Sequence, residues 1–325
     1  MLTRRAALTL AAGSALAWRP HTARAQSFPT RSVTIIVPYP AGGPVDAVAR
    51  LIANEGMADL GQAIVVDNRA GGSGAIGSVA VARAEPDGHT IVLGTNQTHA
   101  TNESLIKNLP YQAVKDFVPV AGIADIPHLL VARKDLPVAS AADLIALAKE
   151  KPGALNYGST GNGSASHLAG ELFKVKAGVN TQHVPFRGAA PMTQELLAGR
   201  VDYAFATLPS VLGQVEGGEL KAIAVASARR AERLPNVPTM QEAGIAGVEA
   251  DAWFALFAPA KTPPAALERL YESVSAALGK EGSKAALARQ GMTLALRPPA
   301  VVAAWLPAEV QKWAAVIKAA NVTVE

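Results

Sequence analysis

The 325-residue chain contains no cysteine, which excludes disulfide bonds, thiolate metal ligands and cysteine nucleophiles. Its six histidines show neither the H-x-x-H nor the H-E-x-x-H spacing of zinc sites. The phosphate-binding pattern G-x-x-x-x-G-K-[ST] is also missing from the sequence. We therefore expect no cofactor and no metal.

An excess of positive charge is present only at the start of the chain. The 30 Lys+Arg and 26 Asp+Glu residues give a formal charge of +4. Four of the arginines and none of the acids lie in residues 1–25, so the rest of the chain is neutral. Basicity therefore gives no indication of a nucleic-acid or membrane-surface partner.

Residues 1–25 have the features of a secretory signal peptide. Arg4 and Arg5 precede an apolar stretch at 6–18, and Ala23-Arg24-Ala25 fits a small-x-small cleavage site. The arginine pair also fits a twin-arginine signal, and the export route stays open. A membrane anchor is disfavoured because the apolar stretch is too short to span a bilayer. A cysteine-free exported chain fits a periplasmic location.

The remaining residues, about 300, are enough for two domains. Short apolar segments alternate with amphipathic ones, which predicts parallel sheets covered on both faces by helices. No later segment is expected to have the length of a transmembrane helix. The predicted strands are 33–37, 63–66, 90–93, 117–123, 128–132, 154–157, 181–184, 201–206, 220–226 and 253–258, and the predicted helices are 46–59, 76–84, 141–150, 164–176, 192–198, 264–278, 284–289 and 299–320.

The first strand ends in a turn that lacks side chains. Ala41, Gly42 and Gly43 follow it, and Pro44 then favours the first position of a helix. The first amides of a helix have no internal partners and lie at the positive end of its dipole. The turn is therefore a candidate anion site. Asp46 in the first helical turn suits the dipole, and its role is either binding or helix stabilisation.

A second strand, turn and helix follow near residue 160. The turn contains three glycines and four hydroxyl groups between Gly158 and Ser166, which allow close approach of a ligand and donation to a carboxylate. A simple helix-capping loop is the alternative, and His167 alone favours a structural role. This echo of the first turn predicts two similar α/β lobes.

Two enzymatic interpretations fit poorly. Gly72, Gly74 and Gly77 spell G-x-G-x-x-G, but the next strand supplies no acid for a ribose. A serine hydrolase needs G-x-S-x-G, and Ser164 has Asn162 and Ser166 where glycines should stand. Nucleotide binding and acyl hydrolysis are therefore both disfavoured.

Further candidates flank the turns. Phe186 and Arg187 lie between a strand and a helix. Phe186 is either a core or a cleft residue, and Arg187 is either solvated or a partner for a second carboxylate. Tyr39 either lies at the rim of the pocket or is a packing residue.

Six motifs in this order resemble the substrate-binding receptors of tripartite tricarboxylate transporters, the Bug-type periplasmic proteins. The resemblance covers essentially the whole chain after residue 25. It rests on VTIIVPYPAGGPVD (33–46), VDNRAGGSG (66–74), PDGHTI (86–91), YGSTGNGSASHLAGELF (157–173), VPFRGAAP (184–191) and LPNVPTM (234–240).

The resemblance implies two doubly wound α/β lobes with a ligand cleft between them, of the type II periplasmic-binding-protein kind. It implies that turns 39–46 and 158–166 grip one carboxylate from opposite lobes, and that Thr98 and Phe186 line the cleft. Val45 and Tyr39 depart from the family pattern, which commonly has Ser or Thr and Phe there. The expected ligand residues are Tyr39, Ala41, Gly42, Gly43, Asp46, Thr98, Ser159, Thr160, Gly161, Ser164, Phe186 and Arg187.

The sequence thus predicts a monomeric periplasmic receptor, not an enzyme, that delivers an organic carboxylate to membrane transporter subunits. A ligand-responsive sensor or adaptor is the alternative, ahead of a serine hydrolase. The predicted lobes are 26–124 plus 248–325 and 125–247. Segments 117–123 and 252–258 are the predicted crossings between them.

Overall fold

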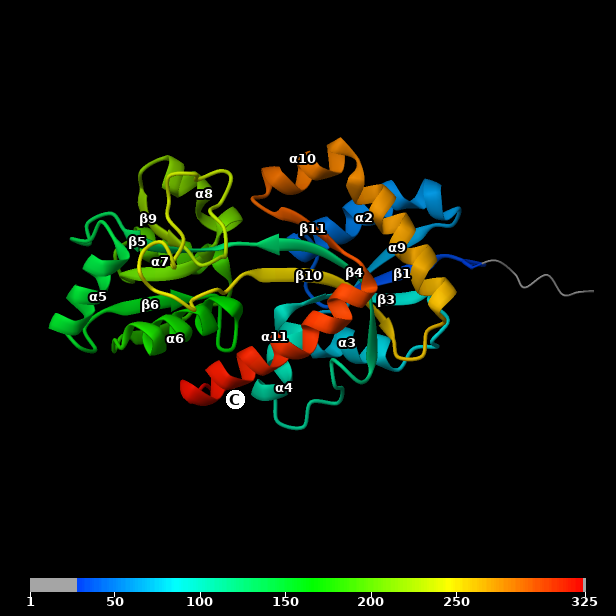
Figure 1. Cartoon of the computed structure of the whole chain (residues 1–325), viewed down its shortest axis with the longest axis horizontal. Helices are drawn as coiled ribbons and strands as arrows, with labels where there is room; N and C mark the ends of the chain where they lie inside the picture. Colours follow the sequence, from blue (N-terminus) through cyan, green and yellow to red (C-terminus); the bar gives the residue numbers. More distant parts are fainter. Residues whose placement is uncertain (1–27, 324–325) are drawn as a thin grey trace, which may run out of the picture.

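Two β-sheets, each covered by helices, form two lobes in the computed structural model, which describes residues 28–323 (Figure 1). The predicted signal peptide, residues 1–25, lies outside the described residues. We call the part around the six-stranded sheet lobe 1 and the part around the five-stranded sheet lobe 2. This arrangement confirms the predicted two-lobed α/β fold.

Lobe 1 has the strand order β11-β4-β10-β3-β1-β2. Its strand β1 is buried at four of its five positions, as expected for a β-branched run covered on both faces. The strands are β1 (Val33–Val37), β2 (Ile64–Asn68), β3 (Thr90–Thr95), β4 (Phe117–Ile126), β10 (Ala252–Pro259) and β11 (Thr293–Arg297). The helices are α2 (Pro44–Leu60), η1 (Gly72–Gly74), α3 (Ala75–Ala82), η2 (Gln97–Thr101), α4 (Asn102–Leu105), α9 (Pro264–Gly279), α10 (Glu281–Arg289) and α11 (Pro299–Ala319).

Lobe 2 has the strand order β7-β6-β8-β5-β9. The strands are β5 (His128–Arg133), β6 (Asn156–Ser159), β7 (Gln182–Pro185), β8 (Tyr203–Thr207) and β9 (Leu220–Val225). The helices are α5 (Ala141–Glu150), α6 (Ala165–Ala177), α7 (Ala189–Leu197) and α8 (Leu208–Glu216).

Both sheets are mixed, so the expectation of purely parallel sheets was wrong. Strands β1, β2 and β3 are parallel, whereas β10 runs antiparallel to β3 and β4. In lobe 2, β5 is antiparallel to β8 and β9. The antiparallel strands belong to the segments that pass between the lobes or return at the chain end. The alternating pattern carries no information on their direction. The sequence analysis also missed α8 and β11.

The topology of the two sheets confirms the repeat of strand, turn and helix that predicted two similar lobes. In lobe 1 the strand β1 lies between β2 and β3, and in lobe 2 the strand β6 lies between β7 and β8. At such a position the connections from two neighbouring strands run in opposite directions, which opens a crevice between them. Open α/β sheets bind ligands in this crevice, at the carboxyl ends of the strands. The two candidate turns lie at the ends of β1 and β6.

Two long segments run between the lobes, as Figure 1 shows. Strand β4 of lobe 1 leads through Pro127 directly into β5 of lobe 2. The chain returns to lobe 1 at β10, which lies beside β4. The residue boundaries of the two predicted lobes stay a prediction.

Helix α11 contacts both lobes at their junction. It packs against β4, η2 and α4 of lobe 1 and against α6 of lobe 2. With 21 residues and a mean hydropathy of 1.2 in its most apolar window, it is long and apolar enough to cross a membrane by composition alone. The sequence expectation that no later segment has this length was therefore wrong. Its buried apolar residues, Val302, Leu306, Trp313, Val316 and Ile317, belong to one apolar cluster, so one face of α11 packs into the core.

Candidate ligand site

The turn after β1 presents unpaired backbone amides. Gly43 is the N-cap of α2, with φ −81° and ψ 172°, and no side chain caps the helix. The amides of Ala41, Gly43 and Val45 donate to no acceptor within residues 28–323. Since the helix dipole adds positive potential there, this turn can accept an anion without losing an internal hydrogen bond.

Asp46 lies beneath this turn and holds its shape. The carboxylate is buried, and its Oδ2 accepts from the Gly42 amide and the Arg50 Nε, both at 2.9 Å. Asn68 Nδ2 donates to its Oδ1 at 3.0 Å. The hydrogen bond from Arg50 is the largest cause that lowers the pKa of Asp46 to about 2. The amide of Gly42 is therefore already bound to Asp46, unlike those of Ala41 and Gly43, and Asp46 stabilises the turn.

The turns after β1 and β3 are joined by hydroxyl groups. Tyr39 Oη lies 2.8 Å from Thr95 Oγ1 and donates to Gln97 Oε1 at 3.2 Å, and burial raises the pKa of Tyr39. Thr98 is 1% exposed. Its hydroxyl accepts from the Thr95 amide at 2.9 Å. In this conformation Thr98 organises its own turn, and its contact with a ligand stays a prediction.

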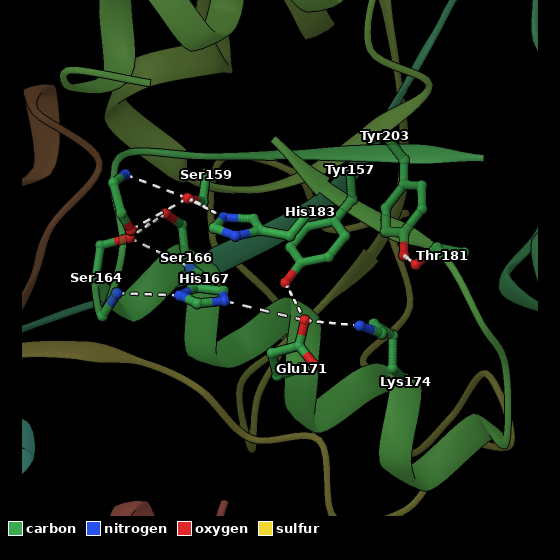
Figure 2. A network of polar contacts seen from close by, with 12 residues as sticks. Tyr157, Ser159, Ser164, Ser166, His167, Glu171, Lys174, Thr181, His183 and Tyr203 are labelled. Carbon is green, nitrogen blue, oxygen red and sulfur yellow. Dashed lines mark hydrogen bonds and ion pairs between the residues drawn. The ribbon is translucent and has the colours of Figure 1, made fainter. Parts of the chain in front are cut away.

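The turn after β6 is built around the hydroxyl of Ser166 (Figure 2). Ser166 Oγ accepts from the Thr160 amide at 2.8 Å and lies 3.0 Å from both Thr160 Oγ1 and Ser164 Oγ. Ser164 is the N-cap of α6 and accepts from the His167 amide at 3.3 Å. Thr160 and Ser164 are half-buried, whereas Ser166 is buried, so we expect the first two hydroxyls to be the more accessible to a ligand.

Ser159 and Gly161 form the inner side of this turn. Ser159 is fully buried, accepts from the Gly161 amide at 3.2 Å and lies 2.6 Å from His183 Nε2. The side chain of Ser159 is therefore a support. Gly161 has φ +135°, a conformation that other residues rarely adopt.

Phe186 and Arg187 lie next to the second turn but differ in exposure. The Phe186 amide donates to the Ser159 carbonyl at 3.0 Å, and its ring packs at the edge of a lobe 2 core cluster. Arg187 is exposed, and its guanidinium forms no ion pair within the described part of the chain. Arg187 is therefore available for a ligand, whereas the Phe186 ring is partly covered by its contacts with the lobe 2 core.

Sequence reasoning missed three supporting residues. Asn68 and His183 contact the turns from distant segments, and no local pattern signals such contacts. Ser166 was visible only as one of four hydroxyls in the turn. Its central position follows from the helical geometry, which directs it back toward Thr160.

The two turns belong to different lobes, and no hydrogen bond within residues 28–323 joins them. A cavity of about 830 Å³ does extend between the lobes, and Gly72, Ser73 and Lys107 of lobe 1 and Asn162 of lobe 2 line it. Asn162 belongs to the second turn, but Ala41, Gly43 and Thr160 do not line the cavity. The described residues hold no cluster of three or more possible metal ligands.

Acid should destabilise the fold below about pH 6.5, the pKa of histidine in an unfolded chain. Burial lowers the pKa of His99 to about 3 and those of His128, His167 and His183 to about 4. The unfolded state therefore binds more protons between these values, and stability falls as the pH falls. The depressed pKa of Asp46 adds a loss only below about 4. Thermal midpoints measured from pH 7.5 to 4.5 should fall steadily, and a constant midpoint would contradict this.

A two-lobed α/β fold with paired helix-capping turns at the carboxyl ends of β1 and β6 defines a solute-binding protein of the periplasmic class. The model of the tripartite tricarboxylate transporter family receptor, TctC, matches residues 48–322. The chain belongs to this family, whose members are periplasmic substrate-binding receptors and not enzymes.

Relatives and solved structures agree with this assignment. A UPF0065 protein of Pseudomonas sp. (strain P51) is 39% identical over 93% of this chain and 91% of its own. Protein BugT of Bordetella pertussis is 36% identical over 90% of each chain. A protein of R. palustris solved with adipate is 39% identical, with a TM-score of 0.81 over 91% of this chain and 100% of its own. MatC of Rhodopseudomonas palustris with bound malate is 36% identical, with a TM-score of 0.77 over 89% and 100%.

The geometry also argues against a serine nucleophile. His167 Nδ1 accepts from the Gly163 amide at 3.0 Å, and Ser164 Oγ contacts Ser166 Oγ and the His167 amide but neither ring nitrogen of His167. The one serine that touches an imidazole nitrogen in Figure 2, Ser159, is fully buried. A general base must reach the hydroxyl that attacks a substrate, and no exposed hydroxyl in this turn has one.

Proposed function

We propose that this protein binds a small organic carboxylate between the turn at 39–46 and the turn at 158–166 and delivers it to a tripartite tricarboxylate-type membrane transporter. The observation that carries the proposal is the set of unpaired amides at Ala41, Gly43 and Val45. Beneath them, the charge of Asp46 is neutralised by Arg50 at 2.9 Å. The first turn therefore offers donors without a repelling charge.

The second turn supplies matching chemistry. An ionised carboxylate is an acceptor only, and Thr160 and Ser164 carry half-buried hydroxyls that are able to donate. Arg187 adds an exposed cation nearby. Adipate and malate, the ligands of the two solved relatives, are dicarboxylates, which supports this ligand class.

The expected strength suits reversible capture. A hydrogen bond to a charged group contributes about 1.5–3 kcal/mol, and four to six of them are offset by the ordering of groups and by lobe closure. A micromolar dissociation constant needs only about 8 kcal/mol. Binding of this kind holds a solute tightly enough for capture and loosely enough for release.

We propose that the lobes close to bring both turns against one ligand. Within residues 28–323 the chain passes between the two sheets twice, in the β4–β5 segment and in the return to β10, and such connections act as hinges in two-lobed proteins. The proposed moving units are residues 26–124 with 248–325 and residues 125–247. We propose that the protein acts as a monomer in the periplasm after removal of residues 1–25.

A carboxylate panel should reveal the ligand class. Purified protein without residues 1–25 is heated with dicarboxylates, tricarboxylates, acidic amino acids and aromatic acids, and with nucleotides and carboxylate esters as controls. A ligand present at 100 times its dissociation constant stabilises the folded state by about 2.7 kcal/mol. We expect one or a few carboxylates to raise the thermal midpoint, whereas their methyl esters do not. A shift with esters or nucleotides alone would refute carboxylate binding.

A further inference from the structure

The second turn rests on two stacked imidazole rings, which Figure 2 shows one above the other next to Ser159 and Ser166. His167 comes from α6 and His183 from β7. Their ring centroids are 3.7 Å apart and the ring planes differ by 4°. His167 is 6% exposed. Neither ring is needed to cap α6, because Ser164 already does so.

The contact of His167 with the backbone fixes its tautomer. The Gly163 amide donates to His167 Nδ1 at 3.0 Å. A backbone amide is only a donor, so Nδ1 must be unprotonated and the ring proton must lie on Nε2. Nε2 faces Glu171 Oε1 at 3.9 Å. Neutral His167 is therefore the form that holds Gly163.

His183 holds the other glycine of the turn through Ser159. His183 Nε2 lies 2.6 Å from Ser159 Oγ, which accepts from the Gly161 amide at 3.2 Å. Gly161 and Gly163 have φ values of +135° and +72°, so the turn between them needs fixed contacts to stay in one conformation. The two imidazoles supply one such contact each.

Burial and Lys174 favour the neutral form of both rings, whereas Glu171 opposes it at His183 by raising the pKa. Glu171 already accepts from Tyr157 Oη at 2.5 Å and from Lys174 Nζ at 2.8 Å, which leaves it a weak partner for a histidinium. The ring of Tyr157 stacks on His183, with centroids 4.9 Å apart, and Tyr203 in turn stacks on Tyr157. Burial, with Lys174 adding to it, lowers the pKa of His167 to about 4.

We propose that His167, stacked on His183, is a positioning residue for the ligand-binding turn, and that proton uptake at its Nδ1 releases Gly163 and weakens carboxylate binding. A protonated Nδ1 is a donor that faces the donor of Gly163, so their hydrogen bond cannot persist. A second charge on the stacked ring would add repulsion at 3.7 Å. The effect on the ligand rests on the proposed function, whereas the hold on Gly163 does not.

The first test needs no ligand. Side-chain nitrogen NMR of the purified protein near pH 7.5 should show His167 protonated at Nε2 and bare at Nδ1. The Gly163 amide proton should shift and exchange faster with solvent as His167 takes up a proton. If Nδ1 carries the proton at neutral pH, or if exchange at Gly163 does not follow the titration, the proposal is wrong.

The second test compares two substitutions by calorimetry with adipate and, separately, with malate. In His167→Asn, Oδ1 stands near the position of Nδ1, accepts from Gly163 and cannot take up a proton at these pH values. In His167→Leu the acceptor is lost. We expect His167→Asn to bind like the original protein near pH 7.5, and His167→Leu to bind about tenfold more weakly, as for one lost hydrogen bond.

The pH dependence of ligand affinity distinguishes a positioning role of His167 from a role in packing alone. Since the pKa of His167 is about 4, the extra loss of affinity in the original protein should begin below about pH 5 and reach about tenfold relative to His167→Asn at about pH 3, one unit below that pKa. Protonation of the ligand itself affects both proteins equally and cancels in the ratio. Equal losses would overturn the proposal, as would unchanged binding by His167→Leu. If neither ligand binds any variant, the proposed function fails for these ligands, and the NMR result still decides the role of His167.

Discussion

Ser164→Ala is expected to weaken carboxylate binding by about ten- to hundredfold, the effect of one lost hydrogen bond to a charged group. Ser164 is half-buried in the second turn, and its Oγ contacts only Ser166 Oγ and the His167 amide within residues 28–323. It is also the N-cap of α6, so the same substitution should cost about 1 kcal/mol of stability. Affinity and stability must therefore be measured separately.

Ser140→Ala is the matched control for that substitution. Ser140 is the N-cap of α5, where it accepts from the Asp143 amide at 3.1 Å, and it lies away from both turns. Its loss should cost a similar amount of stability and leave calorimetric affinity unchanged. Thr160→Val tests the neighbouring hydroxyl in the same way. If Ser164→Ala lowers stability like Ser140→Ala but binds normally, Ser164 is only a cap.

Gly43→Ala should reduce carboxylate affinity at least about tenfold, a loss of some 1.4 kcal/mol, with little change in folding. The φ of −81° suits alanine, and the added methyl would have its nearest protein atom, Pro40 O, at 3.6 Å. Alanine is a somewhat poorer N-cap than glycine, so we expect a stability change below about 1 kcal/mol. We expect the methyl instead to hinder the close approach of a carboxylate to the unpaired amides of this turn.

Gly213→Ala is the control for the first turn. Gly213 lies within α8, and a methyl there would meet no atom within 4 Å. This substitution should raise stability by up to about 1 kcal/mol, because alanine is the better helix former, and leave affinity unchanged. Normal binding by Gly43→Ala would show that the ligand does not pack against this amide, which would remove the first turn from the site.

The two turns were predictable because they depend on local chemistry. A β-branched strand, a side-chain-free turn and a proline at the first helical position fix the geometry near Gly43 with little help from the rest of the chain. The Ser164 cap and the positive-φ glycines of the second turn follow in the same way. The repetition of this pattern predicted two similar lobes, and topology confirmed it.

The supports of the turns were not predictable from local patterns. Asn68 bonds to Asp46 across 22 positions of the sequence, and His183 reaches Ser159 across 24. Both contacts depend on the parallel register of β1 with β2 and of β6 with β7. Asp46 shows the same limit, because a helix-start acid binds a ligand or caps its own turn according to the groups that surround it.

The sequence by itself determined the family, the alternation of strands and helices, and the position of both turns, because these are carried by short motifs and by local conformational preference. Only the tertiary structure decided that Gly42 is already paired, that Thr98 is buried, and that the sheets are mixed. It also placed the two imidazoles of His167 and His183 against each other. Each of these facts depends on which distant segments lie side by side. Such contacts have no local sequence pattern and are visible only in the folded structure.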